Sequence, residues 1–142
     1  MKRKASAVWN GDPVSGRGTM SGPSGVLSKT PYSFKTRFEE PVTGTNPEEL
    51  IAAALAGCFS MAFSHDLASA DHTPEQVATD AELDLEQIGG GFSITRIHLA
   101  VKARVPGIDE ETFQRIAKAT KEGCPVSRAL KVEITMDARL DA

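Results

Sequence analysis

The sequence contains two cysteines, Cys58 and Cys124, and these are the residues best suited to covalent chemistry. A thiolate is a strong nucleophile, and two thiols that meet in a fold can be oxidised to a disulfide and reduced again. Two cysteines are too few for a disulfide scaffold, and they lack the paired Cys and His spacing of a structural zinc site. The composition therefore leaves two possibilities, which are inert packing and redox chemistry.

The local sequence around each cysteine leaves both possibilities open. Cys58 lies inside a long apolar segment, where a cysteine is more often a small core residue. Cys124 follows Gly123, a natural helix terminator, and precedes Pro125, which suits the first position of a new helical turn. Its sulfur would lie near unpaired backbone N–H groups that favour a thiolate, although an ordinary loop cysteine fits the same residues. Together the two sites suggest a dithiol/disulfide couple.

The element expected to carry Cys58 is a helix that runs from Pro47 to Ala68 or Ser69. Asn46 can cap its free backbone N–H groups, and a proline fits the first helical position. Apolar residues surround this helix on all sides, which predicts that it is buried in the middle of the protein. Gly57 is costly in a helix interior, so we expect another segment to pack close to the backbone beside Cys58.

The rest of the chain is expected to form short strands, one long hairpin and a second helix. Strands are predicted at residues 4–9, 16–21, 25–27 and 32–38, followed by a polar loop at residues 39–45. A hairpin is predicted over residues 76–105, with a bulge near Thr95 and Arg96 where the alternation of apolar residues slips by one. A helix from about Asp109 to Gly123, a short helical turn through Leu130 and a strand at residues 132–136 complete the chain. This pattern predicts a single α+β domain over residues 1–142.

Length, composition and charge favour one soluble globular domain. The chain has 142 residues, of which 40% are hydrophobic and 25% charged, and its formal net charge is -3. This balance argues against binding to nucleic acid and against binding to an anionic membrane surface. The longest apolar stretch, Leu50 to Phe59, is about half of the ~20 residues that a membrane span needs, and no signal peptide is recognisable. We therefore expect a cytoplasmic location, where paired thiols are more often redox-active than structural.

Several motifs together resemble the OsmC/Ohr family of thiol peroxidases, and the resemblance covers nearly the whole chain. The two cysteine motifs are Ala56-Gly57-Cys58-Phe59-Ser60-Met61-Ala62 and Gly123-Cys124-Pro125-Val126-Ser127. Further matching segments are Ala7 to Gly11, Ser24 to Leu27, Pro31 to Phe34, Thr36 to Glu39, Gly44 to Ile51 and Val105 to Asp109. The segment Thr36-Arg37-Phe38-Glu39, expected as a strand just before the central helix, favours the OsmC branch. The resemblance implies a long buried central helix packed on antiparallel sheets in an intertwined homodimer.

The resemblance also implies a role for four residues. Cys58 is expected to be the peroxidatic thiolate and Cys124 the resolving thiol, with Arg37 as the activating cation and Glu48 as the carboxylate that positions it. A buried thiol is mostly protonated at neutral pH and needs a positive neighbour to ionise. A guanidinium stays charged and can donate hydrogen bonds to both sulfur and peroxide oxygen. Without the resemblance, Arg37 and Glu48 fit a solvated strand residue and a first-turn helix acid; no metal or cofactor is expected.

The spacing along the central helix predicts that the site needs two chains. Glu48 and Cys58 are ten residues apart, which corresponds to about 15 Å along a regular helix. This is too far for the Glu48 carboxylate to hold an arginine against the sulfur of its own chain. If the four residues share one site, Arg37 and Glu48 come from a second chain, in agreement with the homodimer that the resemblance implies.

The implied function is the reduction of organic hydroperoxides to alcohols. Cys58 would become a sulfenic acid, Cys124 would condense with it to a disulfide, and an external dithiol would reset the pair. For the family this dithiol is expected to be a dihydrolipoyl group carried on another protein. Apolar walls would favour organic peroxides, and the candidates, which also fit plain core packing, are Phe34, Phe38, Phe59 and Phe63. Two alternatives are a non-enzymatic thiol redox sensor and a small-ligand-binding protein whose cysteines only pack.

Overall fold

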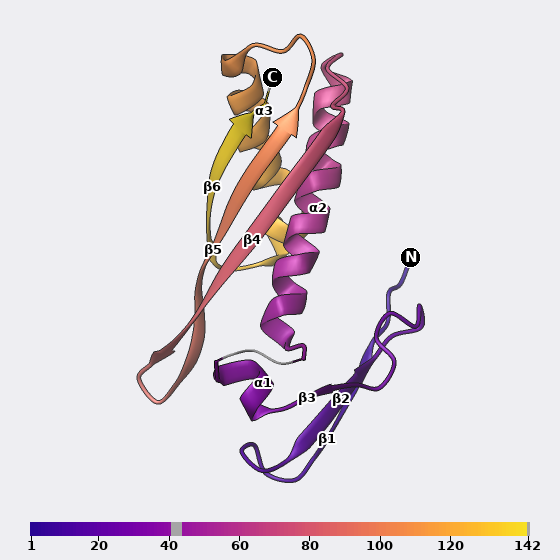
Figure 1. Ribbon diagram of the computed structural model, residues 1–142, viewed down its shortest axis with the longest axis vertical. Coiled ribbons are helices and arrows are strands. Elements are labelled where there is room, and N and C mark those ends of the chain that lie inside the picture. Colours follow the sequence, from indigo (N-terminus) through magenta and orange to yellow (C-terminus); the bar gives the residue numbers. More distant parts are fainter. Residues whose placement is uncertain (41–43, 142) are drawn as a thin grey trace. The chain divides into compact units, whose positions relative to one another are not determined.

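The structure is a computed structural model that describes residues 1–40 and 44–141 (Figure 1). It divides into two compact units, an N-terminal unit from Met1 to Leu50 and a C-terminal unit from Ile51 to Ala142. Of the polar loop predicted at residues 39–45, residues 41–43 lie outside the described part of the chain.

The N-terminal unit contains a small antiparallel sheet. Its strands are β1 (Ser6–Asn10), β2 (Arg17–Ser21) and β3 (Thr30–Tyr32), in the order β1-β2-β3. The first two strands agree closely with those predicted at residues 4–9 and 16–21. The prediction of a strand at residues 25–27 is wrong, because this segment consists of bends and Gly25 has a φ of 82° that no strand contains.

The predicted strand at residues 32–38 is also wrong over most of its length. β3 ends at Tyr32, and a short helix, α1 (Phe34–Phe38), follows it. The helix starts with a capping box, in which the Ser33 hydroxyl accepts from the Thr36 N–H at 3.3 Å and the Ser33 N–H donates to the Thr36 hydroxyl at 2.9 Å. The alternation of apolar residues favours a strand here, but the local hydrogen bonds of these two side chains favour a helix. Arg37 therefore lies on a helix and not on a strand.

The long helix α2 (Pro47–Ser69) confirms the prediction at both ends. The side-chain oxygen of Asn46 accepts from the Glu49 N–H at 2.7 Å, and Pro47 occupies the first helical position. The apolar stretch from Leu50 to Phe59 was predicted to be too short for a membrane span. The whole helix α2, in contrast, meets the length and composition criteria for a helix that could cross a membrane. Core helices of soluble proteins meet the same criteria.

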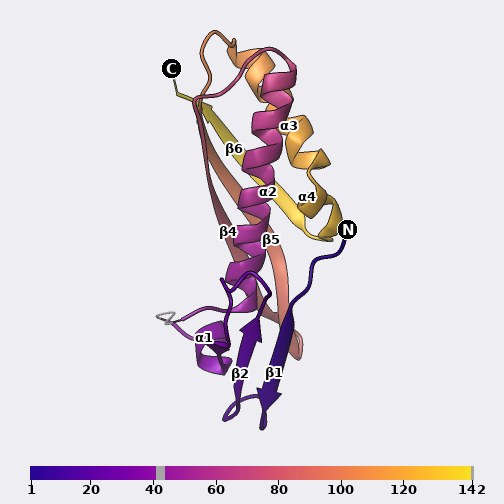
Figure 2. The same cartoon turned by 90° about the vertical axis from the view of Figure 1, so that its right-hand side faces the viewer.

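The C-terminal unit is a three-stranded sheet with helices on one face (Figures 1 and 2). β4 (Gln76–Ile88) and β5 (Gly91–Arg104) form the predicted hairpin, and β6 (Glu133–Leu140) pairs with β5. β6 runs parallel to β5, which corrects the prediction of purely antiparallel sheets. The reason is the connection, since α3 (Glu110–Gly123) and α4 (Pro125–Ala129) carry the chain back to start a strand in the same direction.

The hairpin contains the predicted bulge. Asp84 pairs with Arg96 and Leu85 pairs with Ile94, so Thr95 is the extra residue. The extra residue shifts the alternation by one, and this keeps the apolar side chains of β5 on one face of the sheet. The buried residues of this face are Ile97, Leu99, Val101 and Ala103.

The core of the C-terminal unit lies between the sheet and the helices. Leu55, Phe59, Phe63 and Leu67 follow each other at four-residue spacing on α2 and are fully buried. The rest of the helix surface is largely uncovered, because 22% of its apolar stretch is buried and Met61 is 79% exposed. The C-terminal unit thus buries one face of α2, whereas a helix buried in the middle of the protein was predicted. The expected close contact at Gly57 is also missing, because an added Cβ would meet no described atom within 4 Å.

Candidate active site

The fold of the C-terminal unit brings the two cysteines into contact. Cys58 lies on α2 and is half-buried, whereas Cys124 lies between α3 and α4 and is 2% exposed. Cys124 raises the pKa of Cys58, which places the two thiols near each other, and both cysteines are free. Residues that are far apart in the sequence thus meet as a reduced dithiol, the arrangement that a reversible disulfide requires.

The surroundings of Cys58 within its unit favour the protonated thiol. Burial is the largest influence and raises the pKa of Cys58 above its ordinary value of 9.0. The backbone N–H of Val126 donates toward the sulfur and lowers this pKa, whereas the hydrogen bond with Cys124 and the charge of Cys124 raise it. A thiol with a raised pKa is mostly protonated at neutral pH, so this sulfur needs a positive neighbour to become a reactive thiolate.

A hydroxyl group completes the surroundings of Cys124. Ser127 Oγ lies 3.0 Å from Cys124 Sγ, and both side chains are buried. Cys124 is the N-cap of α4, but its sulfur makes no capping hydrogen bond. The start of α4 instead provides a polar contact to each sulfur, from the Val126 N–H to Cys58 and from the Ser127 hydroxyl to Cys124. Sequence reasoning missed Ser127, although its place three residues after the N-cap is where side chains reach back to the cap residue.

The other two predicted site residues meet in the N-terminal unit. Arg37 Nε donates to Glu48 Oε1 at 2.7 Å, which forms an ion pair between α1 and the first turn of α2. The side chain of Glu48 is 8% exposed and that of Arg37 is 40% exposed. Asn46 ties the two helices together, because its amide donates to Thr36 O at 2.9 Å while its side-chain oxygen caps α2. Glu48 therefore binds the guanidinium at one nitrogen, and the central carbon of the group lies 4.9 Å from the centroid of the Phe38 ring. The two terminal nitrogens have no hydrogen bond among the described residues.

Glu48 has one carboxylate oxygen without a donor. Oε2 is buried and has no hydrogen-bond partner in the part of the chain that the structure describes. A buried carboxylate oxygen without a donor is unfavourable, so a complete site is expected to bring a further N–H or O–H group to it.

An aromatic cavity lies beside Arg37. It has a volume of about 250 Å³ and is lined by Trp9, Pro13, Tyr32, Ser33, Phe34, Arg37 and Phe38. The strand register places Trp9 and Tyr32 on either side of Gly18, where an added Cβ would come within 2.6 Å of both rings. Glycine at this position lets the two rings approach each other, with their centroids 5.4 Å apart. The cavity thus offers apolar surface next to a positive charge.

The four phenylalanines that were candidates for an apolar wall lie in two different places. Phe34 and Phe38 line the aromatic cavity, whereas Phe59 and Phe63 have no exposed surface and belong to the core. Trp9 and Tyr32 were not among the candidates, and the strand pairing that brings them together across Gly18 involves three separate strands.

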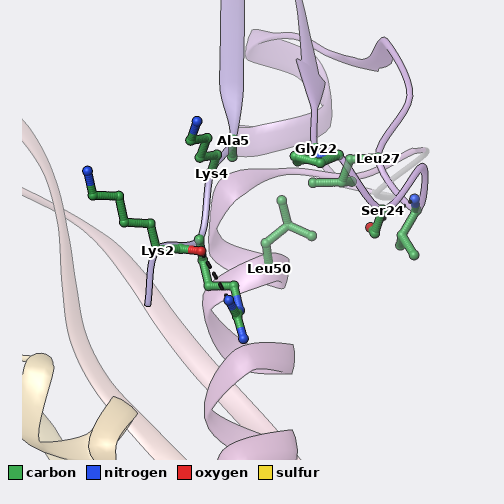
Figure 3. A pocket seen from close by; sticks show the side chains of 10 residues that line it. Lys2, Lys4, Ala5, Gly22, Ser24, Leu27 and Leu50 are labelled. Carbon is green, nitrogen blue, oxygen red and sulfur yellow. Dashed lines mark hydrogen bonds between the residues drawn. The ribbon is translucent and has the colours of Figure 1, made fainter.

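A larger cavity in the N-terminal unit has different chemistry. It has a volume of about 610 Å³ and lies among residues 2–5, the loop from Gly22 to Leu27, and Leu50 (Figure 3). The described residues that line it combine basic side chains with apolar surface and include no thiol or carboxylate. This cavity therefore lacks the groups that peroxide chemistry needs.

The four predicted site residues thus form two pairs, Arg37 with Glu48 and Cys58 with Cys124, each inside one unit. Within residues 1–40 and 44–141, no group of three or more His, Cys, Asp or Glu side chains is arranged to hold a metal ion. The chemistry available is that of a dithiol and of a guanidinium held by a carboxylate.

Comparisons with known proteins identify a family and several relatives of this chain. The family profile described as OsmC-like protein matches residues 39–139. The chain is 51% identical to Peroxiredoxin OsmC of Escherichia coli (strain K12), over 97% of this chain and 96% of that protein. It is 34% identical to an organic hydroperoxide resistance protein of Xanthomonas axonopodis pv. citri, over 66% of each. The crystal structure of the organic hydroperoxide resistance protein OhrB of Bacillus subtilis matches with a TM-score of 0.68 at 26% identity, covering 96% of this chain and 98% of that one.

These matches extend through both units, and the fold agrees with that of a solved relative. The relative at 51% identity spans all four predicted site residues as well as the helices that carry them. The chain belongs to the OsmC-like protein family.

Proposed function

We propose that this protein is a thiol peroxidase that reduces organic hydroperoxides to alcohols. The observation that carries the proposal is the pair of free thiols, near enough for Cys124 to shift the pKa of Cys58, in a chain that is 51% identical to Peroxiredoxin OsmC. Cys58 is the more accessible of the two sulfurs, and we assign it the attack on the peroxide. Cys124 is buried against it, and we assign it the resolving role.

The proposed cycle has three steps. The Cys58 thiolate attacks the outer oxygen of the hydroperoxide, the O–O bond breaks, and the organic oxygen takes up a proton and leaves as an alcohol. Cys58 is left as a sulfenic acid, with which the Cys124 thiol condenses to form a disulfide and water. An external dithiol then reduces the disulfide by thiol exchange and is itself oxidised to a disulfide. The family resemblance supports a dihydrolipoyl group on another protein as this dithiol.

The aromatic cavity supports an organic rather than an inorganic peroxide as the substrate. Trp9, Tyr32, Phe34 and Phe38 give the cavity apolar walls that gain little from hydrogen peroxide but can bury a hydrocarbon group. Arg37 also lines this cavity, and a guanidinium can donate hydrogen bonds to the peroxide oxygens. The organic part of the substrate would then lie against the rings, with its O–O group toward the guanidinium.

We further infer that Arg37 and Glu48 act on the Cys58 of a second copy of the chain. Glu48 and Cys58 lie ten residues apart on one continuous helix, a separation of about 15 Å along its axis. The uncovered side of α2, which includes Ala53, Gly57 and Met61, supplies the apolar surface that a second copy would bury. A homodimer would also bring new donors within reach of the unpartnered Glu48 Oε2.

The experiment that tests the function measures turnover of cumene hydroperoxide with dihydrolipoamide as the reductant. We expect consumption of many equivalents of peroxide per chain, a faster reaction than with hydrogen peroxide, and near-complete loss in Cys58→Ser. Oxidation that stops after one equivalent would identify a redox sensor instead of an enzyme. Full activity in Cys58→Ser would assign the cysteines to packing and overturn the proposal.

A further inference from the structure

The contact between Ser127 and Cys124 is the closest polar contact that the structure gives to either sulfur. Ser127 Oγ lies 3.0 Å from Cys124 Sγ in a buried environment. Ser127 is the third residue of α4, and Cys124 is its N-cap, so one turn of helix fixes the geometry. The sulfur does not cap the helix, and among the described residues its hydrogen-bond contact is with the Ser127 hydroxyl.

Two consecutive residues of α4 therefore act on different sulfurs. The Val126 N–H donates toward Cys58, and the Ser127 hydroxyl contacts Cys124. A backbone N–H can only donate, whereas a hydroxyl both accepts and donates and turns to suit its partner. The Ser127 hydroxyl can thus accept from the Cys124 S–H while the thiol is intact and donate to the sulfur once its proton is lost. A hydrogen bond to an ionised partner is roughly twice as strong as one between neutral groups.

We propose that Ser127 is a catalytic residue of the disulfide-forming step, in which its hydroxyl stabilises the Cys124 thiolate that attacks the oxidised Cys58. This assignment rests on the peroxidase function proposed above. In the step, the Cys124 sulfur supplies the electron pair of the new S–S bond, and the S–O bond of the Cys58 sulfenic acid breaks. The departing oxygen leaves as water with the proton that Cys124 lost, so Cys124 is oxidised, Cys58 is reduced and no further reductant is needed.

The test measures two steps separately, which are the reduction of the peroxide by Cys58 and the formation of the Cys58–Cys124 disulfide. Reduced protein is mixed with one equivalent of cumene hydroperoxide, and peroxide loss and disulfide formation are followed separately by rapid quench, the latter by mass spectrometry. For Ser127→Ala we expect peroxide loss close to that of the unaltered protein and disulfide formation roughly tenfold slower at pH 7, the size expected for one charge-assisted hydrogen bond.

Two further variants show whether the hydroxyl itself matters. Ser127→Thr keeps the hydroxyl and should restore most of the rate. Ser60→Ala is the matched control, because it removes a half-buried hydroxyl, bonded to Thr79 Oγ1 at 2.7 Å, two residues from Cys58. It should leave both halves of the reaction unchanged. Under excess peroxide, the Cys58 sulfenic acid that is not resolved in Ser127→Ala should be oxidised further to the sulfinic acid. Cys124→Ser, which has no resolving thiol, should show the largest amount of this product.

The possible failures have different meanings. Disulfide formation in Ser127→Ala at the rate of the unaltered protein would overturn the role of Ser127 and leave the peroxidase function intact. A deficit that Ser127→Thr does not restore would assign the residue to packing and would also overturn the proposal. If the unaltered protein consumes no peroxide, the proposed function fails and this inference fails with it.

Discussion

At the scale of single residues, the surroundings of Cys58 within the C-terminal unit oppose its ionisation. Burial raises the pKa of that thiol, and the neighbouring Cys124 raises it further, so the Val126 N–H alone opposes two effects. Arg37 is suited to reverse this balance, because its guanidinium stays charged and Glu48 holds it at Nε only. The charge and the sulfur that needs it belong to different units of the chain.

This balance predicts how Arg37→Ala changes the pH dependence of Cys58. Without the cation, the raised pKa of the buried thiol determines its ionisation, so less thiolate is present at pH 7. The rate of alkylation of Cys58 by iodoacetamide, followed by peptide mass spectrometry, should fall about tenfold at pH 7, and its profile should move to higher pH, since one pKa unit is a factor of ten. Arg17→Ala, which removes an exposed arginine of β2, is the control and should leave the profile in place. An unchanged profile in Arg37→Ala would show that another group activates Cys58.

At the scale of elements, the position of Arg37 depends on how α1 begins and how it is joined to α2. The capping box of Ser33 and Thr36 starts the helix, and Asn46 links the Thr36 carbonyl oxygen to the first turn of α2. The ion pair between Arg37 and Glu48 therefore spans two elements that are held by local hydrogen bonds. A helix of five residues has little stability of its own, so its caps carry much of the positioning.

The caps of α1 and α3 allow a matched pair of substitutions. Ser33→Ala removes the cap of α1, and Asp109→Ala removes the cap of α3, in which the carboxylate accepts from the Thr112 N–H at 3.0 Å. Each should lower the free energy of unfolding by about 1 kcal/mol in chemical denaturation. Only Ser33→Ala should also slow peroxide turnover, because only α1 carries Arg37. Equal effects of the two variants on turnover would show that the order of α1 does not matter for the site.

At the scale of the whole molecule, the C-terminal unit by itself leaves much of α2 uncovered. The buried side of the helix packs on the sheet of this unit, while Ala53, Gly57 and Met61 are exposed. Exposed apolar surface of this kind marks an interaction surface in soluble proteins. The proposed partner is a second copy of the chain, which would complete both the core and the proposed site.

A mixture of two inactive variants tests whether the site is shared between chains. Arg37→Ala and Cys58→Ser are each expected to be nearly inactive, but a mixed dimer has one site that combines the intact Arg37 of one chain with the intact Cys58 of the other. Half of the dimers in an equal, refolded mixture are mixed, and each has one complete site of two, so about a quarter of the normal turnover should return. Size-exclusion chromatography with light scattering should show a dimer that Met61→Glu weakens. No recovery of turnover in a mixture that forms dimers would place the whole site in one chain.

Much of this fold follows from local features of the sequence. The start of α2 at Asn46 and Pro47, the end of α3 at Gly123 and the bulge at Thr95 were predicted, because caps, helix terminators and side-chain alternation act over a few residues. The strand expected in place of α1 was wrong, because side-chain hydrogen bonds of Ser33 and Thr36 compete with alternation over the same residues. The parallel pairing of β6 depends on where α3 and α4 return the chain, which local patterns do not encode.

The sequence by itself determined the family, the four candidate site residues and the helix that carries Cys58. Only the tertiary structure decided that Cys58 meets Cys124 and Ser127, that Arg37 pairs with Glu48, and which aromatic rings line a cavity. The physical reason is that caps and periodicity are set by neighbours along the chain. Contacts between sulfurs, charges and rings are set by the packing of segments that are distant in sequence.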